Sequence, residues 1–449
     1  MASIYTKSMQ IFNAENFKAS IGDASQPYVY FTFGKVEPWP SVINPPLEDP
    51  PQANSSVDTF NQVWKNMIGA KKIVGNDVRL AIRRFDWVSG TVYTAYDDSE
   101  AALDMNDPDV KFYVVTDEWN VYKCLGNNNG GASTVKPTSI NTYIAEQVAD
   151  KYIWKYMYTL SDEEKLRFTT SNFIPVRTLT EDNGTLQWHV QNSAGQGSIG
   201  SIKIVNAGSN YSTVNPPTIT ITGDGTGAEA IATVNATSLG VESILITNKG
   251  QNYTRANVTF ASAVGGGASA RVIMSPAGGH GANPVEELGG SFVIINPRLR
   301  GSESGVIDTQ NEIRQIALIK NPILRDGTTI ASEVVYSQTT KVIVQKEGDN
   351  YEEDEYVFQG SDLETATFKG RVVSWNSAQN ILDLVDVSGT LTSQGGVLQG
   401  SISNAGRLHL SSIDKSFTPY TGTLLYINNI TPIQRATDQT EDFKIVVSF

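Results

Sequence analysis

YVYFTFGKVEPWP, from Tyr28 to Pro40, predicts a buried strand that leads into a stiff loop. Side chains alternate along a strand, and here both faces carry apolar or aromatic residues, so both faces should be covered. Gly34 interrupts the strand. The Pro-Trp-Pro run at 38–40 then favours an extended exit, because proline restricts its own backbone and that of the preceding residue.

A helix is predicted shortly after this loop, whereas residues 1–27 are expected to form an edge strand and a connector. Ser55 or Ser56 can cap the helix, and Asp58 falls in its first turn, where a carboxylate complements the helix dipole. Gly69 is a natural terminator. One apolar stripe at helical spacing is formed by Phe60, Val63, Trp64, Met67 and Ile68.

An internal repeat with a 42-residue period lies in the middle of the chain. The segment SIKIVNAGSNY at 201–211 recurs as SILITNKGQNY at 243–253, and ITI at 219–221 recurs as VTF at 258–260. Each copy predicts strands joined by an Asn/Gly turn that a tyrosine fills. Two copies are too few to close a propeller, so a small duplicated β-domain is expected.

The whole pattern predicts a mainly β fold: a β-sandwich core with a few short helices, interrupted by two inserted all-β domains. The core would comprise residues 1–189, 286–331 and 417–449. The first insert would be a Gly/Tyr-repeat domain at 190–285. The second, at 332–416, has short β-runs separated by turns, a spacing typical of a compact barrel or sandwich.

Composition excludes several classes of function. Hydrophobic residues make up 40% of the 449 residues, enough to bury substantial cores. The net charge of −13 argues against wrapping of nucleic acid, which requires clustered positive charge. Cys124 is the only cysteine, so no intrachain disulfide can form, which fits assembly in a reducing cytoplasm. No apolar run is long enough to span a membrane, so no membrane partner is expected.

No catalytic, cofactor or metal site is predicted. The three histidines, His189, His280 and His409, lie far apart and lack partners at metal-ligand spacing. His280 lies within GGHG at 278–281 and invites a functional interpretation, but the glycines explain a turn without chemistry. A loop histidine that hydrogen-bonds a turn is therefore favoured. No Ser-His-Asp, Cys-His or paired-carboxylate arrangement stands out.

Two acidic clusters have simple explanations. Asp104, Asn106, Asp107 and Asp109 suggest calcium, but they lack the mid-loop glycine and terminal glutamate of an EF-hand, so a solvated acidic loop is favoured. The acidic run at 347–355 could dock a basic neighbour, although a solvated hairpin tip is favoured.

Short motifs that follow one another in a fixed order carry a family resemblance. They are FTFG (31–34) with Glu37-Pro38-Trp39, VWKNMIG (63–69), IRRFDW (82–87), VYKCL (121–125), YIWKY (152–156), IRQI (313–316) with Asn321-Pro322, and DQTE (438–441). Together these motifs resemble the dimeric baseplate wedge subunit of contractile-tailed, T-even-type bacteriophages. They extend from the first tenth of the chain almost to its end and leave the two inserts unmatched.

The resemblance implies a structural protein rather than an enzyme. Relatives form homodimers, join other baseplate wedge subunits and help transmit host attachment into sheath contraction, so the expected location is the virion tail baseplate after assembly in the host cytoplasm. Arg and Trp are favoured at interface hot spots. For Arg83 and Arg84, an internal ion pair with Asp86 is an equally open explanation. The interface or scaffold candidates are Trp39, Trp64, Arg83, Arg84, Trp87 and Trp154.

A carbohydrate-binding or adhesion protein of the phage tail is the alternative function. Tyr211, Tyr253 and Trp375 in the inserts could stack on sugars, although the matched places of the two tyrosines favour filling of their own turns. A polysaccharide-degrading enzyme is a third hypothesis, and it would need a carboxylate pair at a defined separation.

Overall fold

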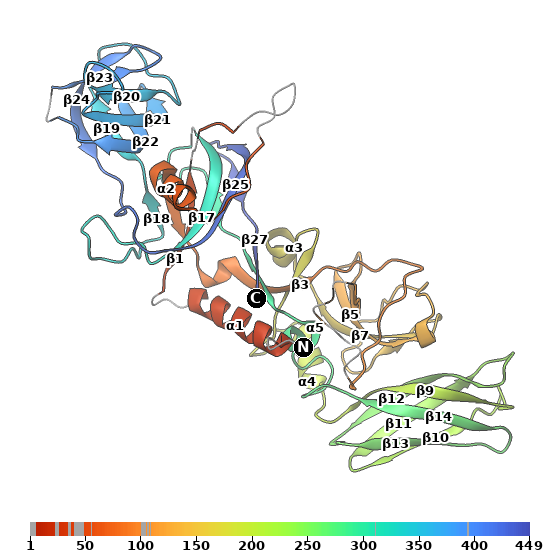
Figure 1. Cartoon of the computed structure of the whole chain (residues 1–449). Helices are drawn as coiled ribbons and strands as arrows, with labels where there is room; N and C mark the ends of the chain where they lie inside the picture. The colour runs from red at the N-terminus through yellow and green to blue at the C-terminus, as the bar shows by residue number, and fades with distance from the viewer. Residues whose placement is uncertain are drawn as a thin grey trace. The chain divides into compact units, whose positions relative to one another are not determined.

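The computed structural model describes residues 6–22, 27–34, 37–39, 49–54, 56–99, 105, 107, 109–309, 311–392 and 395–449. The fold is mainly β with a few short helices, which confirms the predicted class (Figure 1). The chain divides into two compact units. The first unit comprises Met1–Lys18, Arg79–Ile295 and Lys444–Phe449, and the second comprises Ala19–Val78 and Asn296–Phe443. The predicted division into a core and two inserts is a different partition, and it stays a prediction.

The aromatic stretch near the N-terminus forms the central strand of the second unit. β1 (Val29–Gly34) pairs antiparallel with β2 (Met67–Lys72) on one side and β17 (Glu312–Lys320) on the other. All six residues of β1 are buried, as the apolar character of both faces predicts. The sheet has the order β18-β2-β1-β17-β25, with β18 at Val335–Ser337 and β25 at Thr423–Gln434.

The helix predicted after the loop is present but shorter than its apolar stripe. α2 (Val57–Asn66) has Ser56 as its N-cap, whose Oγ accepts a hydrogen bond from Thr59 N at 3.2 Å. Met67 and Ile68 belong to β2, because pairing with β1 outcompetes another helical turn. The glycine expected to end the helix, Gly69, instead lies within β2, where an added Cβ would come within 2.5 Å of the Phe33 ring.

The N-terminal prediction of an edge strand is wrong, because residues 7–22 form α1 (Lys7–Gly22). Ile11, Ala14 and Ile21 are buried, and their spacing of three and seven residues places them on one face. Met9 and Phe12 are exposed. Because its apolar residues lie on both the buried and exposed sides, the helix lacks the single stripe that marks an amphipathic helix in a sequence.

Apart from α1 and the repeat, the described part of the first unit contains two four-stranded sheets and three short α-helices. One sheet has the order β27-β15-β3-β8: Ile445–Ser448, Phe292–Ile295, Val78–Arg83 and Phe173–Val176. The other has the order β4-β5-β7-β6: Tyr113–Val115, Asn120–Asn127, Tyr152–Thr159 and Glu146–Gln147. The helices are α3 (Asp162–Phe168), α4 (Leu186–Ser193) and α5 (Pro284–Leu288).

The two repeat copies are interlocked rather than stacked one after the other. The first copy supplies β9 (Ile199–Ser209), β10 (Thr218–Gly223) and β11 (Thr226–Val234), and the second supplies β12 (Val241–Gln251), β13 (Ala256–Ala261) and β14 (Gly266–Met274). β9 pairs with β14, β11 with β12, and β10 with β13 (Figure 1). The first strand of each copy thus pairs with the last strand of the other.

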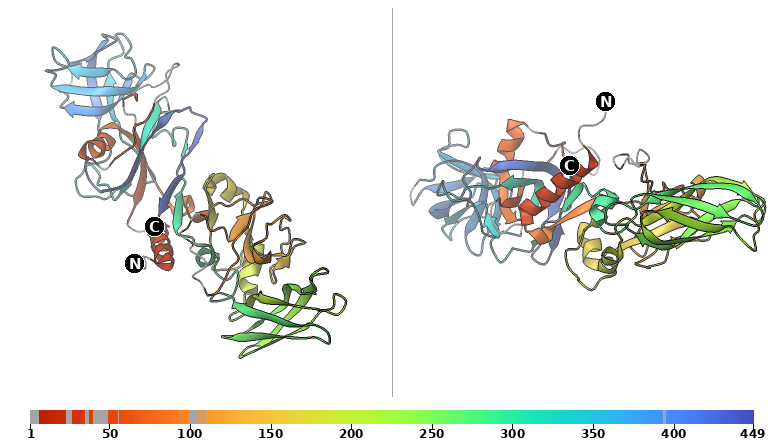
Figure 2. Two further views of the ribbon diagram at one scale, coloured as in Figure 1. Left: turned by 45° about the vertical axis from the view of Figure 1, so that its right-hand side comes forward. Right: turned by 90° about the horizontal axis from the view of Figure 1, so that it is seen from below.

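In the second unit a closed barrel of six strands follows β18 (Figure 2). Around the barrel the order is β19-β22-β21-β20-β23-β24. The strands are Thr340–Val344, Ile381–Gly389, Phe368–Asn376, Tyr356–Gln359, Val397–Gly400 and Gly406–Ile413. Two further short strands, β16 (Arg298–Arg300) and β26 (Thr440–Asp442), pair with each other, and the single-turn 3-10 helices are η1 (Gly75–Asp77) and η2 (Asn128–Gly130).

Candidate functional site

Two of the four candidate tryptophans lie inside the protein. Trp64 is buried in the core of the second unit, and Trp154 is buried in the core of the first. Neither can contact a partner molecule while the chain is folded. Trp39 and Trp87 are half-buried, and their indole N–H groups donate hydrogen bonds to Ile430 O and Ser133 Oγ, each at 3.1 Å.

The two candidate arginines are partly exposed and already have partners within the chain. Arg84 Nε donates to Asp86 Oδ1 at 2.9 Å, and the guanidinium lies 5.0 Å from the centroid of the Trp119 ring. Arg83 lies over the ring of Phe292 at 5.5 Å. The internal ion pair, one of the two explanations that the sequence left open, is therefore present.

A buried charge cluster lies between β5 and the segment around α5. Lys123, with 1% of its side chain exposed, places Nζ 2.9 Å from Glu287 Oε2 and 3.2 Å from His280 Nδ1. The other Glu287 oxygen accepts a hydrogen bond from Gly281 N at 2.7 Å. The Tyr96 ring covers the cluster, with its centroid 4.3 Å from Lys123 Nζ and 4.8 Å from the His280 ring. His280 is thus part of an ionic cluster, not only a turn residue.

The contact with Lys123 favours one tautomer of His280, whose Nδ1 lies 3.2 Å from Lys123 Nζ and 3.5 Å from Glu287 Oε2. A lysine ammonium donates hydrogen bonds and cannot accept them, so the Nδ1 atom that faces Lys123 is the acceptor and the proton resides on Nε2. Burial and the nearby Lys123 charge lower the pKa of His280 to about 4. Burial opposes ionisation of Glu287, but the nearby Lys123 charge outweighs it and lowers the pKa to about 2.

Acid should weaken the first unit through this cluster. Because the folded-state pKa of His280 lies below its usual value of 6.5, the unfolded chain binds a proton that the folded chain rejects. The stabilisation is complete above pH 6.5 and is lost as the pH falls through about 4. Between pH 7 and pH 5 we expect a loss of about 2 kcal/mol.

Hydrogen exchange of β5 and β7 at the two pH values, corrected for intrinsic exchange rates, measures this loss. His280→Asn should flatten the pH dependence, whereas His189→Asn, at an exposed position, should leave it unchanged. An equal pH dependence in the His280 variant would contradict the assignment.

The six strands β9–β14 form the repeat module. A surface ion network joins its first strand, β9, and its last strand, β14, to the body of the first unit. Arg271 in β14 pairs with both Asp97 and Asp98, and Arg271 Nη1 lies 2.6 Å from Asp98 Oδ1. Lys203 in β9 approaches Asp97 Oδ2 at 3.4 Å. Burial opposes ionisation of Asp97, but hydrogen bonds from Ser99 and Arg271 lower its pKa. The repeat module is therefore held through charge as well as through its backbone connections.

The loop proposed and rejected as a calcium site is only partly described. Asp104 and Asn106 lie outside the described residues, and Asp107 accepts a hydrogen bond from Asp109 N at 2.9 Å. Among the residues that the structure describes, no group of three or more His, Cys, Asp or Glu side chains is placed to hold a metal ion.

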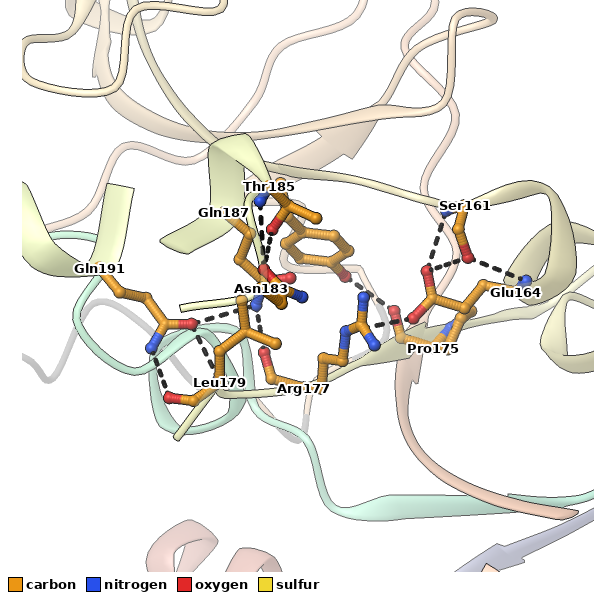
Figure 3. A network of polar contacts seen from close by, with 10 residues as sticks. Ser161, Glu164, Pro175, Arg177, Leu179, Asn183, Thr185, Gln187 and Gln191 are labelled. Carbon is orange, nitrogen blue, oxygen red and sulfur yellow. Dashed lines mark hydrogen bonds and ion pairs between the residues drawn. The ribbon is translucent and has the colours of Figure 1, made fainter. Parts of the chain in front are cut away.

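A second polar network begins at the N-terminus of α3 (Figure 3). Ser161 and Glu164 form a capping box: Ser161 N donates to Glu164 Oε2 at 2.9 Å, and Glu164 N donates to Ser161 Oγ at 3.3 Å. The remaining carboxylate oxygen of Glu164 lies 3.4 Å from Arg177 Nε. One glutamate thus fixes the helix start and the segment that follows β8.

Two glutamines of α4 extend this network along the backbone (Figure 3). Gln187 Nε2 donates to Arg177 O at 2.6 Å. Gln191 bonds both backbone groups of Leu179, accepting from its N–H at 2.9 Å and donating to its carbonyl at 3.0 Å. The arrangement holds backbone in place and presents no pair of groups suited to proton transfer.

Comparison with known proteins found two matches to phage baseplate proteins. Residues 3–136 match the Phage-Gp8 family, described as Bacteriophage T4, Gp8. The baseplate wedge protein gp8 of Enterobacteria phage T4 is 25% identical over 228 residues, which cover 41% of this chain and 67% of the T4 protein. The chain is thus similar to the gp8 baseplate wedge proteins. The family resemblance of the short motifs is thereby confirmed.

The gp8 match includes part of each compact unit. Residues 3–136 contain β1 and α2 of the second unit as well as β3, β4 and β5 of the first. Lys123 lies within the match, whereas His280 and Glu287 lie beyond it. In the described part of the chain, no helix is long and apolar enough to cross a membrane.

Each repeat tyrosine packs beside the glycine of its own turn, Gly208 or Gly250, and its hydroxyl bonds to a strand of the other copy. Tyr211 and Tyr253 are buried, and their hydroxyl oxygens accept hydrogen bonds from Ala268 N at 3.1 Å and Ala228 N at 3.5 Å. These rings are closed to a sugar. Of the three aromatic residues proposed for carbohydrate stacking, only Trp375 is partly exposed, and the Arg407 guanidinium lies over its ring at 4.8 Å.

The sequence alone did not single out Lys123 and Glu287. The available signal was Lys123 itself, a lysine between apolar residues of a strand that is buried on both faces. A lysine at such a position requires a partner, because an unpaired buried charge is costly. The identity of that partner has no local signal, since Glu287 is 164 residues away.

Proposed function

We propose that this chain is a homodimeric structural subunit of a phage tail baseplate wedge, where it contacts other wedge subunits and helps couple host attachment to sheath contraction. It acts by binding and rearrangement rather than by catalysis. It is a virion protein, assembled in the host cytoplasm and located at the baseplate.

The observation that carries this proposal is the match of residues 3–136 to the gp8 family, together with the 25% identity to the T4 wedge protein. The interior of the chain supports it. Its buried polar side chains fix strands and helix ends, as the Lys123–Glu287 pair and the Ser161–Glu164 box do. Such fixed units suit a component that transmits force between neighbours.

The candidates for contacts with neighbouring subunits are the half-exposed members of the predicted set. Trp39, Arg83, Arg84 and Trp87 retain exposed surface, and the Asp86 carboxylate beside Arg84 is exposed. Mixed aromatic and charged patches of this kind are typical of hot spots. Trp64 and Trp154 serve as scaffold only.

Immunogold electron microscopy of virions tests the location. Antibody raised against this chain should label the distal end of the tail, at the baseplate. Label confined to fibres or to the head would contradict the wedge proposal, and label on fibres would favour adhesion.

Light scattering coupled to size-exclusion chromatography tests the homodimer. The purified full-length chain should elute with about twice the mass of the 48.8 kDa protomer. The mass should stay constant on tenfold dilution, because a permanent interface is large and apolar. A mass of one protomer at all concentrations would contradict the homodimer while leaving the baseplate location open.

A further inference from the structure

A small cavity in the first unit lies next to the buried charge cluster. It has a volume of about 30 Å³. Its lining includes Lys155 of β7, Lys249 of β12, and His280, together with Ser198 and Ser275. The polar side chains that line it come from the body of the unit and from both ends of the repeat module. No function considered above uses this cavity.

The two lysines of the lining bring positive charge without a carboxylate. Lys155 is 4% exposed, and its Nζ donates to Thr142 O at 2.7 Å. Lys249 is half-buried, donates to Ser193 O, and lies 4.4 Å from the centroid of the Tyr143 ring. Among the described residues, neither ammonium has an ion-pair partner. Buried charges are normally paired, so this pair of cations calls for a counter-ion.

His280 contributes a third donor to the same cavity. Its Nε2 carries the proton, since Nδ1 accepts from Lys123, and Nε2 is buried without a hydrogen-bond partner. That atom faces Gly200, another lining residue, where an added Cβ would lie 2.6 Å away. The carboxylate of the neighbouring Glu287 is not in the lining, and its oxygens are occupied by Lys123 and Gly281 N.

We propose that this cavity binds a monatomic anion of the size of chloride, held by the ammonium groups of Lys155 and Lys249 and by the Nε2–H group of His280. The hydroxyl groups of Ser198 and Ser275, 2.7 Å apart, offer further donors. The volume selects the size of the ligand, because about 10–15 Å³ of such volume accommodates one water molecule.

Burial and mutual repulsion disfavour charge on both lysines in the empty cavity. Burial, and secondly the charge of Lys249, lower the pKa of Lys155 to about 7, and burial lowers the pKa of Lys249. An anion between them would raise both pKa values and keep the ammonium groups charged at neutral pH. Binding should therefore weaken as the pH rises above about 7, where Lys155 loses its proton in the empty site.

Thermal unfolding of the full-length chain at constant ionic strength tests the proposal. Sodium gluconate is replaced stepwise by sodium chloride or sodium bromide at pH 6.5. The transition temperature of the first unit should rise with the logarithm of the halide concentration above the dissociation constant, by about 3 °C or more at a tenfold excess. Lys155→Met should abolish the rise. Lys136→Met removes one surface charge from the same unit, away from the cavity, and should retain it.

Crystals grown in sodium bromide give a second measurement that does not depend on how the variants fold. An anomalous bromide peak is expected among Lys155 Nζ, Lys249 Nζ and His280 Nε2. No peak in the cavity, or an equal chloride response in Lys155→Met and Lys136→Met, would overturn the proposal and indicate that Lys155 is simply neutral.

Discussion

Replacing Lys123 with methionine should destabilise the first unit by about 3–5 kcal/mol, because the Glu287 carboxylate would remain buried without its cation. The Glu287 side chain is 4% exposed, so water cannot take over the role of the ammonium. Methionine has nearly the length of lysine and keeps most of the packing. The loss would therefore report the unpaired charge rather than a cavity.

Hydrogen exchange resolves this effect by unit. Peptides from β5 and β7 in the first unit should exchange about 10²–10⁴-fold faster in the Lys123 variant, while barrel peptides in the second unit should be unchanged. Lys165→Met is the matched control, because it breaks an exposed ion pair with Asp162 and should cost under about 0.5 kcal/mol.

A double replacement distinguishes the effect of the ion pair on stability from the effect of its surroundings. Lys123→Met combined with Glu287→Leu removes both charges, and most of the lost stability should return, since apolar replacements of buried ion pairs are often neutral. If Lys123→Met alone lowers the free energy of unfolding by less than about 1 kcal/mol, the ion pair does not stabilise the first unit as its burial indicates.

Local elements could be predicted from the sequence wherever one residue pattern decides them. The aromatic character of β1 indicated burial on both faces, and Ser56, one of the two proposed caps, marked the start of α2. The hairpin of β4 and β5 turns at Trp119, which has a positive φ of 65°. These features depend on neighbours within a few positions along the chain.

Features that depend on distant segments could not be predicted. The repeat was visible, but the exchange of strands between its copies was not, because both copies carry the same pattern. Lys123 meets His280 across 157 residues, and no local periodicity encodes such a contact. The end of α2 likewise depends on pairing of Met67 with Gly34 in β1, not on the helical stripe that extends past it.

The acidic run at 347–355 shows how burial can divide a single motif. Glu347 and Asp349 are exposed, as expected for a solvated tip. Glu355, at the end of the run, is 1% exposed and accepts hydrogen bonds from Ile402 N at 2.9 Å and Ser403 N at 3.0 Å. Its carboxylate thus satisfies backbone N–H groups in a turn of the barrel. The expectation of a solvated tip is therefore wrong for this residue.

Arg407→Lys should destabilise the barrel by about 2–4 kcal/mol, although it conserves the charge. Arg407 is 4% exposed, and in the described part of the chain its hydrogen-bond acceptors are backbone carbonyls and Asn380 Oδ1 rather than a carboxylate. Its guanidinium donates instead to four backbone carbonyls in the loop after β19, at distances from 2.6 to 3.1 Å: those of Gln345, Lys346, Gly348 and Asp349. The planar fork satisfies all four at once. A lysine ammonium has three donors at a single point and cannot span them.

Exchange of the loop amides measures this effect directly. In Arg407→Lys, peptides covering residues 345–349 should exchange at least about tenfold faster than in the parent chain, and those from the barrel strands should follow. Arg325→Lys alters an exposed arginine of the same unit, paired with Asp414 at 2.7 Å, and should have little effect. Equal exchange in the two variants would mean that the loop holds its shape without Arg407. The loop backbone would then be stable by itself, with its acidic side chains in solvent. The inward-facing carbonyls would be a consequence of the fold rather than its cause.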